Sequence, residues 1–158
     1  MNRRIYLLGL LAISLAGCAS MQPQNVAQVI GSDPNLSTLS KLISDTGLTE
    51  TLSGTGPFTV FAPTNDAFKA VPAKTMSELA GNKDLLKQVI TYHVVPVKAT
   101  AAEVKAGNVK TVNGANVALA KTANFVTVEE ALVTGADKNA TNGVVHVIDR
   151  VLIPPLKK

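Results

Sequence analysis

Thirteen residues combine the signals of a strand, a corner and a helix: Gly56-Pro-Phe-Thr-Val-Phe-Ala-Pro-Thr-Asn-Asp-Ala-Phe68. Apolar Phe58, Val60 and Ala62 alternate with the residues between them, which is the period of a pleated strand. Pro63 ends that strand, because its nitrogen carries no hydrogen to donate to a sheet ladder. The three residues that follow, Thr64-Asn65-Asp66, are types that cap helices by accepting backbone N–H bonds. The stretch therefore predicts a buried strand that turns directly into a helix.

The first 17 residues have the pattern of a bacterial secretion signal. Arg3 and Arg4 precede an apolar run over residues 5–15, which is too short to span a bilayer as a permanent helix. The run closes with Leu15-Ala16-Gly17-Cys18, which resembles the lipobox of bacterial lipoproteins. That resemblance implies cleavage before Cys18 and acylation of this cysteine. The alternative is an ordinary secretory signal followed by an incidental cysteine.

Acyl chains on Cys18 would attach the mature protein to a membrane, since each buried CH₂ contributes about 0.8 kcal/mol. Ala19 follows the cysteine, and no Asp stands there to indicate retention in the inner membrane. By resemblance to lipoproteins of bacteria with two membranes, we expect a cell-envelope protein with a lipid anchor in the outer membrane. We expect it to face the periplasm, with exposure at the cell surface as the alternative.

Length and composition indicate one globular domain. The chain has 158 residues, of which 46% are hydrophobic and 4% aromatic, and a formal charge of +4. Loss of Arg3 and Arg4 with the signal lowers that charge to +2, so the basic pI is no sign of nucleic-acid binding. Cys18 is the only cysteine, which excludes disulfides and thiol chemistry inside the folded domain. We expect a signal peptide at 1–17, a lipidated tether at 18–25 and a single domain at 26–156.

Helical periodicity dominates the first half of the mature chain. Gly31, Gly47 and Gly81 stand where the apolar periodicity stops, and Asp33-Pro34 is a helix-start signal. Thr100 and Glu103 have the spacing of a capping box. The expected helical segments are residues 26–30, 34–46, 48–52, 72–80, 84–91 and 100–107. Between the last two, residues 92–95 read as a short strand ended by Pro96.

The second half changes to a period of two. Asn113-Gly114 separates two alternating runs at 109–112 and 115–119, which predicts a hairpin. Further strands are expected at 125–128 and 131–134. After Asn142-Gly143, residues 144–148 are apolar enough for a central strand. Helices first and strands second favour an α+β domain.

Three segments together resemble the signature blocks of the fasciclin domain family: residues 56–68, Tyr92-His93 and residues 142–154. The resemblance covers residues 26–154. It implies a fasciclin-like fold, in which a twisted, wedge-shaped β-sandwich packs against several short helices. It also implies a non-catalytic adhesion module that needs no cofactor.

The family resemblance also implies a partner-binding site. In animal members, receptor recognition is attributed to the Tyr-His motif with its flanking aliphatics and to an Asp-aliphatic pair in the preceding helix. The matching positions here are Tyr92, His93, Val89, Ile90, Asp84 and Leu85. Alternatively, the aliphatics belong to the core, and Asp84 is a solvated carboxylate favoured by the helix dipole. Exposure of Tyr92 distinguishes these interpretations, because a fully buried ring cannot contact a partner without rearrangement.

The two histidines, His93 and His146, are expected in the core rather than at a metal, since a zinc site needs three or four ligands. No cluster of His, Asp or Glu at ligand spacing accompanies either histidine. We expect His93 to hydrogen-bond a polar group of the structural corner Thr64-Asn65-Asp66. Asp149, Arg150 and Asp66 are explained by capping and surface pairing.

The sequence favours binding over catalysis. It has no Gly-x-Ser-x-Gly, no P-loop and no dinucleotide fingerprint. Its few aromatic residues provide no stacking platform for nucleic acid. We therefore expect an envelope-anchored adhesion module for a protein or polysaccharide partner, without metal or cofactor. The alternative is a periplasmic carrier of a small apolar ligand such as a carotenoid or lipid, which needs an apolar pocket of roughly 300 Å³ or more.

Overall fold

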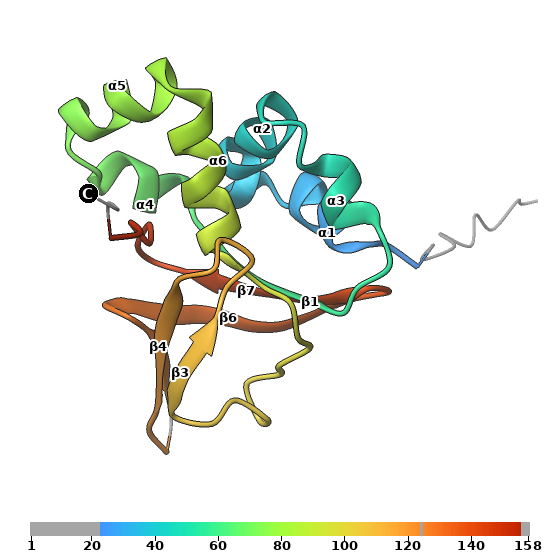
Figure 1. Ribbon diagram of the computed structural model, residues 1–158. Helices are drawn as coiled ribbons and strands as arrows, with labels where there is room; N and C mark the ends of the chain where they lie inside the picture. Colours follow the sequence, from blue (N-terminus) through green and yellow to red (C-terminus); the bar gives the residue numbers. More distant parts are fainter. Residues whose placement is uncertain (1–22, 124, 156–158) are drawn as a thin grey trace, which may run out of the picture.

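The structure is a computed structural model that describes residues 23–123 and 125–155. The expected signal peptide, Cys18 and most of the expected tether lie outside the described residues. Figure 1 shows a layer of short helices above a twisted sheet, with a β-hairpin below it. Within the described residues the element order is helices first and strands mostly second, as predicted.

The helices closely follow the predicted segments. They are α1 (Val26–Ser32), the 3-10 helix η1 (Pro34–Leu36), α2 (Ser37–Asp45), α3 (Thr49–Ser53), α4 (Asn65–Ala70), α5 (Ala73–Gly81) and α6 (Lys83–Tyr92). Asp33 starts η1 by accepting a hydrogen bond from the Asn35 N–H at 2.9 Å. Gly47 follows α2 with φ of 69°, a left-handed conformation that glycine adopts without strain.

Among residues 23–123 and 125–155, seven strands form one hydrogen-bonded sheet in the order β2-β1-β7-β6-β5-β4-β3. They are β1 (Phe58–Pro63), β2 (Val94–Val95), β3 (Gly107–Lys110), β4 (Asn116–Lys121), β5 (Val126–Val128), β6 (Ala131–Ala140) and β7 (Gly143–Ile148). β1 and β7 are parallel, and the other neighbours are antiparallel. β7 lies between β1 and β6 and all its residues are buried, which confirms the predicted central strand.

The sheet folds over into a wedge. Its register shifts twice along β6, on either side of Gly135, and such bulges bend a strand. At one end the two edges of the sheet meet, because the N–H of Val112 donates to the carbonyl of Val94 at 2.8 Å. One hydrophobic core lies between the helices and the two strands β1 and β7. A second lies inside the folded sheet. The expected α+β architecture, a folded sheet packed against several short helices, is observed.

The first signature block forms the strand, corner and helix that its sequence predicts. Thr64 caps α4 by accepting from the N–H of Ala67 at 3.2 Å, and its own N–H donates to the Ile148 carbonyl at 3.1 Å. The Asn65 amide accepts from the N–H of Thr38 at 2.9 Å and donates to the carbonyl of Pro34 at 2.9 Å. The corner therefore joins the end of β1 to β7 and to the start of α2.

Two local predictions are wrong. Tyr92 and His93 are not in a strand, because α6 runs to Tyr92 and the N–H of His93 still donates to the Ile90 carbonyl at 3.0 Å. Only Val94 and Val95 form the strand. At residues 100–107, the N–H of Glu103 donates to the Thr100 hydroxyl at 3.3 Å as in a capping box, but the chain makes a single turn before it enters β3.

The first and third signature blocks meet where β1 and β7 begin. A Cβ on Gly56 would overlap the carbonyl oxygen of Asn142, and a Cβ on Gly143 would overlap that of Phe58. The Asn142 side chain accepts from the N–H of Val26 at 2.8 Å and donates to the carbonyls of Leu52 and Gly54, each at 2.7 Å. Glycine is thus required at positions 56 and 143, where the two backbones approach closely. The side chain of Asn142 joins the start of α1 and the end of α3 to the sheet.

Candidate functional site

His93 connects the three signature blocks. Its Nε2 accepts a hydrogen bond from the N–H of Leu152 at 2.9 Å, so the Nδ1–H is the donor to the Val89 carbonyl at 2.7 Å. Its own carbonyl accepts from the N–H of Phe61 in β1 at 2.9 Å. The ring is buried, and this burial lowers the pKa of His93 to about 4. The imidazole is therefore neutral at pH 7.

The expected bond between His93 and the corner Thr64-Asn65-Asp66 is not formed. Both ring nitrogens are occupied, one by the preceding turn of α6 and the other by Leu152. The corner finds its polar partners in η1, α2 and β7 instead, and the Asp66 carboxylate pairs with Lys69 at 2.8 Å on the surface. The prediction of a core histidine is confirmed for His93, which is 2% exposed.

Tyr92 is also buried, with 3% of its surface exposed. Its hydroxyl lies 3.1 Å from the Asn116 carbonyl and 3.3 Å from the Glu129 carboxylate, and its single proton can be donated to only one of them. Burial, and then the charge of Glu129, raises the pKa of Tyr92. The aromatic ring thus belongs to the core, and only the hydroxyl end borders the surface.

The six predicted partner-binding residues divide into two groups. Four of them are buried, which contradicts a contact role for their side chains: Val89, Ile90, Tyr92 and His93. The reason is that α6 packs this face against the sheet and the neighbouring helices. Asp84 is exposed and Leu85 half-buried, so these two remain accessible in the first turn of α6.

Asp84 and Leu85 line a hollow of about 850 Å³ between α6, the β3–β4 turn and the segment 151–155. Its other walls include Gln88, Asn113 and Pro154. Asp84 at its rim is exposed to solvent. A partner could therefore reach the Asp-aliphatic pair without any change in the fold.

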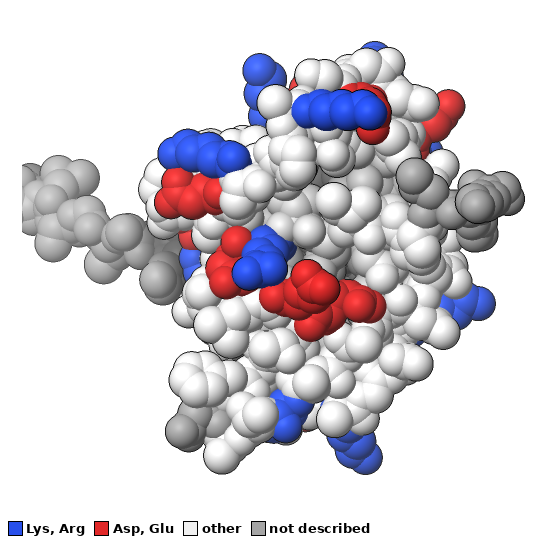
Figure 2. Space-filling view, turned by 90° about the vertical axis from the view of Figure 1, so that its left-hand side faces the viewer, with Lys and Arg blue, Asp and Glu red and all other residues white. Residues whose placement is uncertain are grey.

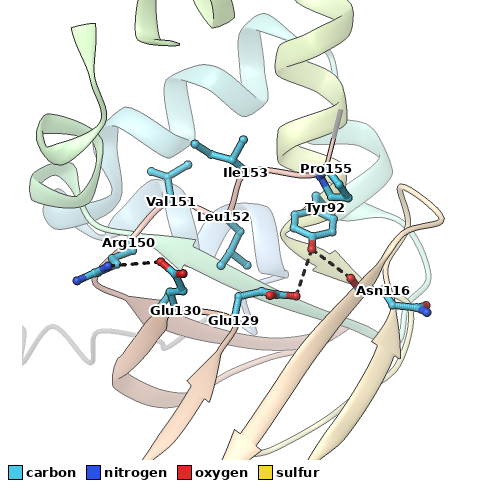
Figure 3. A pocket seen from close by; sticks show the side chains of 10 residues that line it. Tyr92, Asn116, Glu129, Glu130, Arg150, Val151, Leu152, Ile153 and Pro155 are labelled. Carbon is cyan, nitrogen blue, oxygen red and sulfur yellow. Dashed lines mark hydrogen bonds and ion pairs between the residues drawn. The ribbon is translucent and has the colours of Figure 1, made fainter. Parts of the chain in front are cut away.

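A second hollow, of about 500 Å³, lies on the other side of residues 151–155. Figure 3 shows Glu129 and Glu130 below it, Val151, Leu152 and Ile153 above it, and the Tyr92 hydroxyl beside Pro155 at one end. Ile153 is 52% exposed, and Arg150 lies 3.8 Å from the Glu130 carboxylate. Pro155 lines both hollows. We call residues 151–155 with the two hollows the tail surface.

Sequence reasoning missed the second hollow. Glu129 adopts a left-handed φ of 55°, and its carboxylate accepts from the N–H of Ala118 at 2.8 Å. These contacts place the side chain beneath Leu152, as Figure 3 shows. A Glu-Glu pair between two strands indicates only a turn. The available signal was the third signature block, because its last residues line the two hollows, Val151 to Ile153 the second and Pro154 the first.

A sequence model of the Fasciclin domain matches residues 34–154. The chain belongs to the fasciclin domain family. Over 140 residues it is 44% identical to Protein sll1483 of Synechocystis, covering 87% of this chain and 78% of that protein. It is 35% identical over 142 residues to the cell surface glycolipoprotein MPB83 of Mycobacterium bovis, covering 87% of this chain and 64% of that protein.

The fold of this fasciclin domain is also found in a solved structure, a FAS1 domain pair from the insect cell adhesion molecule Fasciclin I. The TM-score is 0.65 at 19% sequence identity, with 83% of this chain and 51% of the insect chain covered. At that identity the likeness concerns the fold alone. It agrees with the wedge and the helical layer described above.

Two apolar hollows of the fasciclin domain are small. One, of about 40 Å³, lies among α2, α5 and α6 and is lined by Leu39, Met76 and Leu86, among others. Another, of about 20 Å³, lies between α3 and β1 beside Leu48 and Phe58. Both are far below the roughly 300 Å³ that a small-molecule pocket needs. Neither has room for a carotenoid or a lipid chain.

His146 and Asp149, two polar residues that the sequence analysis singled out, have structural partners. His146 is 1% exposed, and its ring accepts from the Asp137 N–H at 3.3 Å and donates to the Ala99 carbonyl at 2.8 Å. Asp149 accepts from the N–H of Leu132 at 2.7 Å. In the part of the chain that the structure describes, no three His, Cys, Asp or Glu side chains are grouped as metal ligands. The helices in that same part are all too short or too polar to cross a bilayer.

Proposed function

We propose that this chain is a non-catalytic adhesion module of the cell envelope that binds a protein or polysaccharide partner through its tail surface. The family membership supports the class of function. Among its relatives, MPB83 is by name a cell surface glycolipoprotein, and the structural neighbour comes from a cell adhesion molecule. The geometry supports the location of the contact.

One observation carries the proposal: Asp84, Leu85 and Ile153 stay accessible on two hollows that share Pro155. An exposed apolar side chain beside a concave, partly polar surface is what a partner can cover with good complementarity. The acidic residues near the middle of the face drawn in Figure 2 adjoin a broad uncharged area, which suits a contact with a polar rim.

A catalytic role has less support. The two histidines, which are the usual groups for proton transfer near neutral pH, are buried and hold backbone groups in place. A general acid or base has to reach the substrate proton within hydrogen-bond distance. Neither imidazole has a free nitrogen for that purpose.

The anchor of the proposed module is the lipid on Cys18, preceded by cleavage of the signal peptide 1–17. We propose an outer-membrane anchor, with the domain facing the periplasm or the cell surface. The name of MPB83 supports a lipoprotein of the envelope, since that relative is called a glycolipoprotein of the cell surface.

Site-specific photocross-linking in intact cells tests the contact surface. A photoreactive residue replaces Leu85 or Ile153, with Lys41 on α2 as the exposed control position. We expect the same adduct from positions 85 and 153 and none from position 41, and we expect Asp84→Lys to lower its yield several-fold. Equal adducts from all three positions, or an adduct from position 41 alone, would contradict the proposed contact.

A further inference from the structure

A third hollow, of about 440 Å³, lies at the other end of the sheet from the tail surface. It is lined by residues 53–57, Lys98 and residues 141–143. We call these residues the tether surface, because the N-terminal part of the chain joins the domain here. The carbonyl of Gln24 accepts from the N–H of Thr141 at 2.9 Å, and the N–H of Val26 donates to Asn142 at 2.8 Å.

The tether surface and the tail surface lie at opposite ends of two parallel strands. β1 and β7 both begin beside the third hollow, at Phe58 and Gly143. They end together at Pro63 and Ile148, next to the segment 151–155. Five residue steps at about 3.3 Å each separate the two ends of these strands by about 17 Å. In Figure 1 the described part of the chain begins at one side of the domain and ends at the other.

The short tether brings this end of the domain close to a membrane. Only six residue steps connect Cys18 with Gln24, so an extended chain reaches at most about 20 Å. This limit rests on the proposed acylation of Cys18. A tether of that length restricts the distance from the bilayer, but by itself it does not decide which face of the domain turns toward the lipid.

The tether surface and the tail surface differ in charge. Lys98 is the one charged residue that lines the third hollow, and Ser53, Thr55 and Thr141 add hydroxyl donors. Val97, beside Lys98 in the chain, is 45% exposed. The tail surface carries the carboxylates of Asp84, Glu129 and Glu130 against the cations Lys87 and Arg150, which leaves it a net charge of −1. An anionic bilayer surface attracts the first set of groups and repels the second.

We propose that the tether surface docks on the phosphate headgroups of the anchoring membrane, which turns the tail surface away from the lipid. Tethering makes this contact intramolecular, with an effective concentration in the millimolar range, so a weak interaction is sufficient. The lysine and the hydroxyls bind headgroup phosphates, while Val97 lies at the boundary of the headgroups. The partner-binding end is then presented outward.

The test uses the mature, acylated protein in vesicles of phosphatidylethanolamine and phosphatidylglycerol. A nitroxide is attached to a cysteine introduced at Asn139 on β6, which pairs with Val144 next to Gly143 of the third hollow, or at Ile153 on the tail surface. Collisions with a nickel chelate carried on lipid headgroups measure proximity to the membrane. We expect the collision rate at position 139 to exceed that at position 153 at least fivefold.

Lys98→Glu should reduce this ratio to below twofold, while Lys110→Glu on the exposed strand β3 should leave it unchanged. Equal rates at the two positions, a higher rate at position 153, or a ratio that is insensitive to Lys98→Glu would overturn the inference. A protein that carries no acyl chain, or that does not enter vesicles at all, would instead contradict the proposed anchor. The two failures are therefore distinguishable.

Discussion

The imidazole Nε2 of His93 accepts a hydrogen bond from the backbone N–H of Leu152 at 2.9 Å. This bond joins the end of α6 to the segment 151–155, which separates the two hollows of the tail surface. The carbonyl of the same histidine accepts from Phe61 in β1. The Tyr-His motif is therefore the structural support of the proposed binding surface rather than the contact itself.

The neutral state of His93 predicts a pH-dependent stability. Its pKa is about 4 in the folded protein and 6.5 when unfolded, so the unfolded chain binds more protons between these values. The free energy of unfolding should fall by about 3 kcal/mol as the pH drops from 6.5 to 4. Chemical denaturation at a series of pH values measures this, and His93→Gln should remove most of the slope.

Asp33→Asn provides the control for that slope. The hydrogen bond from Lys138 holds the pKa of Asp33 below its usual value of 3.8. A depressed carboxyl pKa contributes stability above the unfolded value, and this contribution is lost as the pH falls through the folded one. The variant should therefore lower stability at pH 7 yet keep the slope between pH 6.5 and 4. A wild-type protein with constant stability over that window would contradict the assignment.

The Asn-Gly turns at 113–114 and 142–143 should differ in how much stability they lose when the asparagine is replaced by alanine. Asn142 makes three side-chain hydrogen bonds to backbone groups of α1 and the α3 end, whereas Asn113 makes one, to the Gln88 carbonyl at 2.8 Å. Asn142→Ala should lower the free energy of unfolding by about 2–4 kcal/mol, and Asn113→Ala by about 1 kcal/mol or less. Equal losses of unfolding free energy, measured by thermal or urea unfolding, would contradict a stabilising role for the additional hydrogen bonds of Asn142.

Gly143 should tolerate no side chain. A Cβ there would overlap the Phe58 carbonyl, so Gly143→Ala must push β7 away from β1 and should prevent stable folding. Gly81 at the end of α5 has open space where a Cβ would lie, and Gly81→Ala should change stability by less than about 1 kcal/mol. Circular dichroism of the two purified variants measures the difference. A stably folded Gly143→Ala protein would contradict this packing.

The proposed anchor predicts the behaviour of a cysteine variant. Cys18→Ser removes the thiol that would carry the lipid, so the protein should no longer incorporate an alkyne-labelled fatty acid and should leave the membrane fraction. Ser20→Ala, two residues away, should retain both properties. Fatty-acid labelling that persists in Cys18→Ser would place the modification elsewhere.

Much of the fold could be predicted because local signals and tertiary packing agree. The corner after β1, the Asn113-Gly114 hairpin and the buried run of β7 each follow from residue types that leave few alternatives. The parallel pairing of β1 with β7 could not be predicted, since burial of both strands does not identify their neighbours. That pairing depends on the close approach at Gly56 and Gly143.

The site was predicted less well than the fold. Residues 92–95 combine aromatic and β-branched types, which favour a strand, but α6 continues through Tyr92 to its cap at His93, whose carbonyl accepts from the N–H of Phe61. The burial of Tyr92 follows from this extension, because the helix directs the ring into the folded sheet. Asp84 and Leu85 were predicted as partner-binding residues, and they remain accessible for that role.

Adhesion of living cells tests the central claim most directly. Cells that display the wild-type protein, Asp84→Lys, Leu85→Glu or the control Lys41→Glu at equal amounts are compared under flow for attachment to their natural surface or to neighbouring cells. We expect the variants at positions 84 and 85 to reduce attachment about tenfold, to the level of cells without the protein, while Lys41→Glu attaches normally. Normal attachment by both tail-surface variants would contradict a partner contact at this surface.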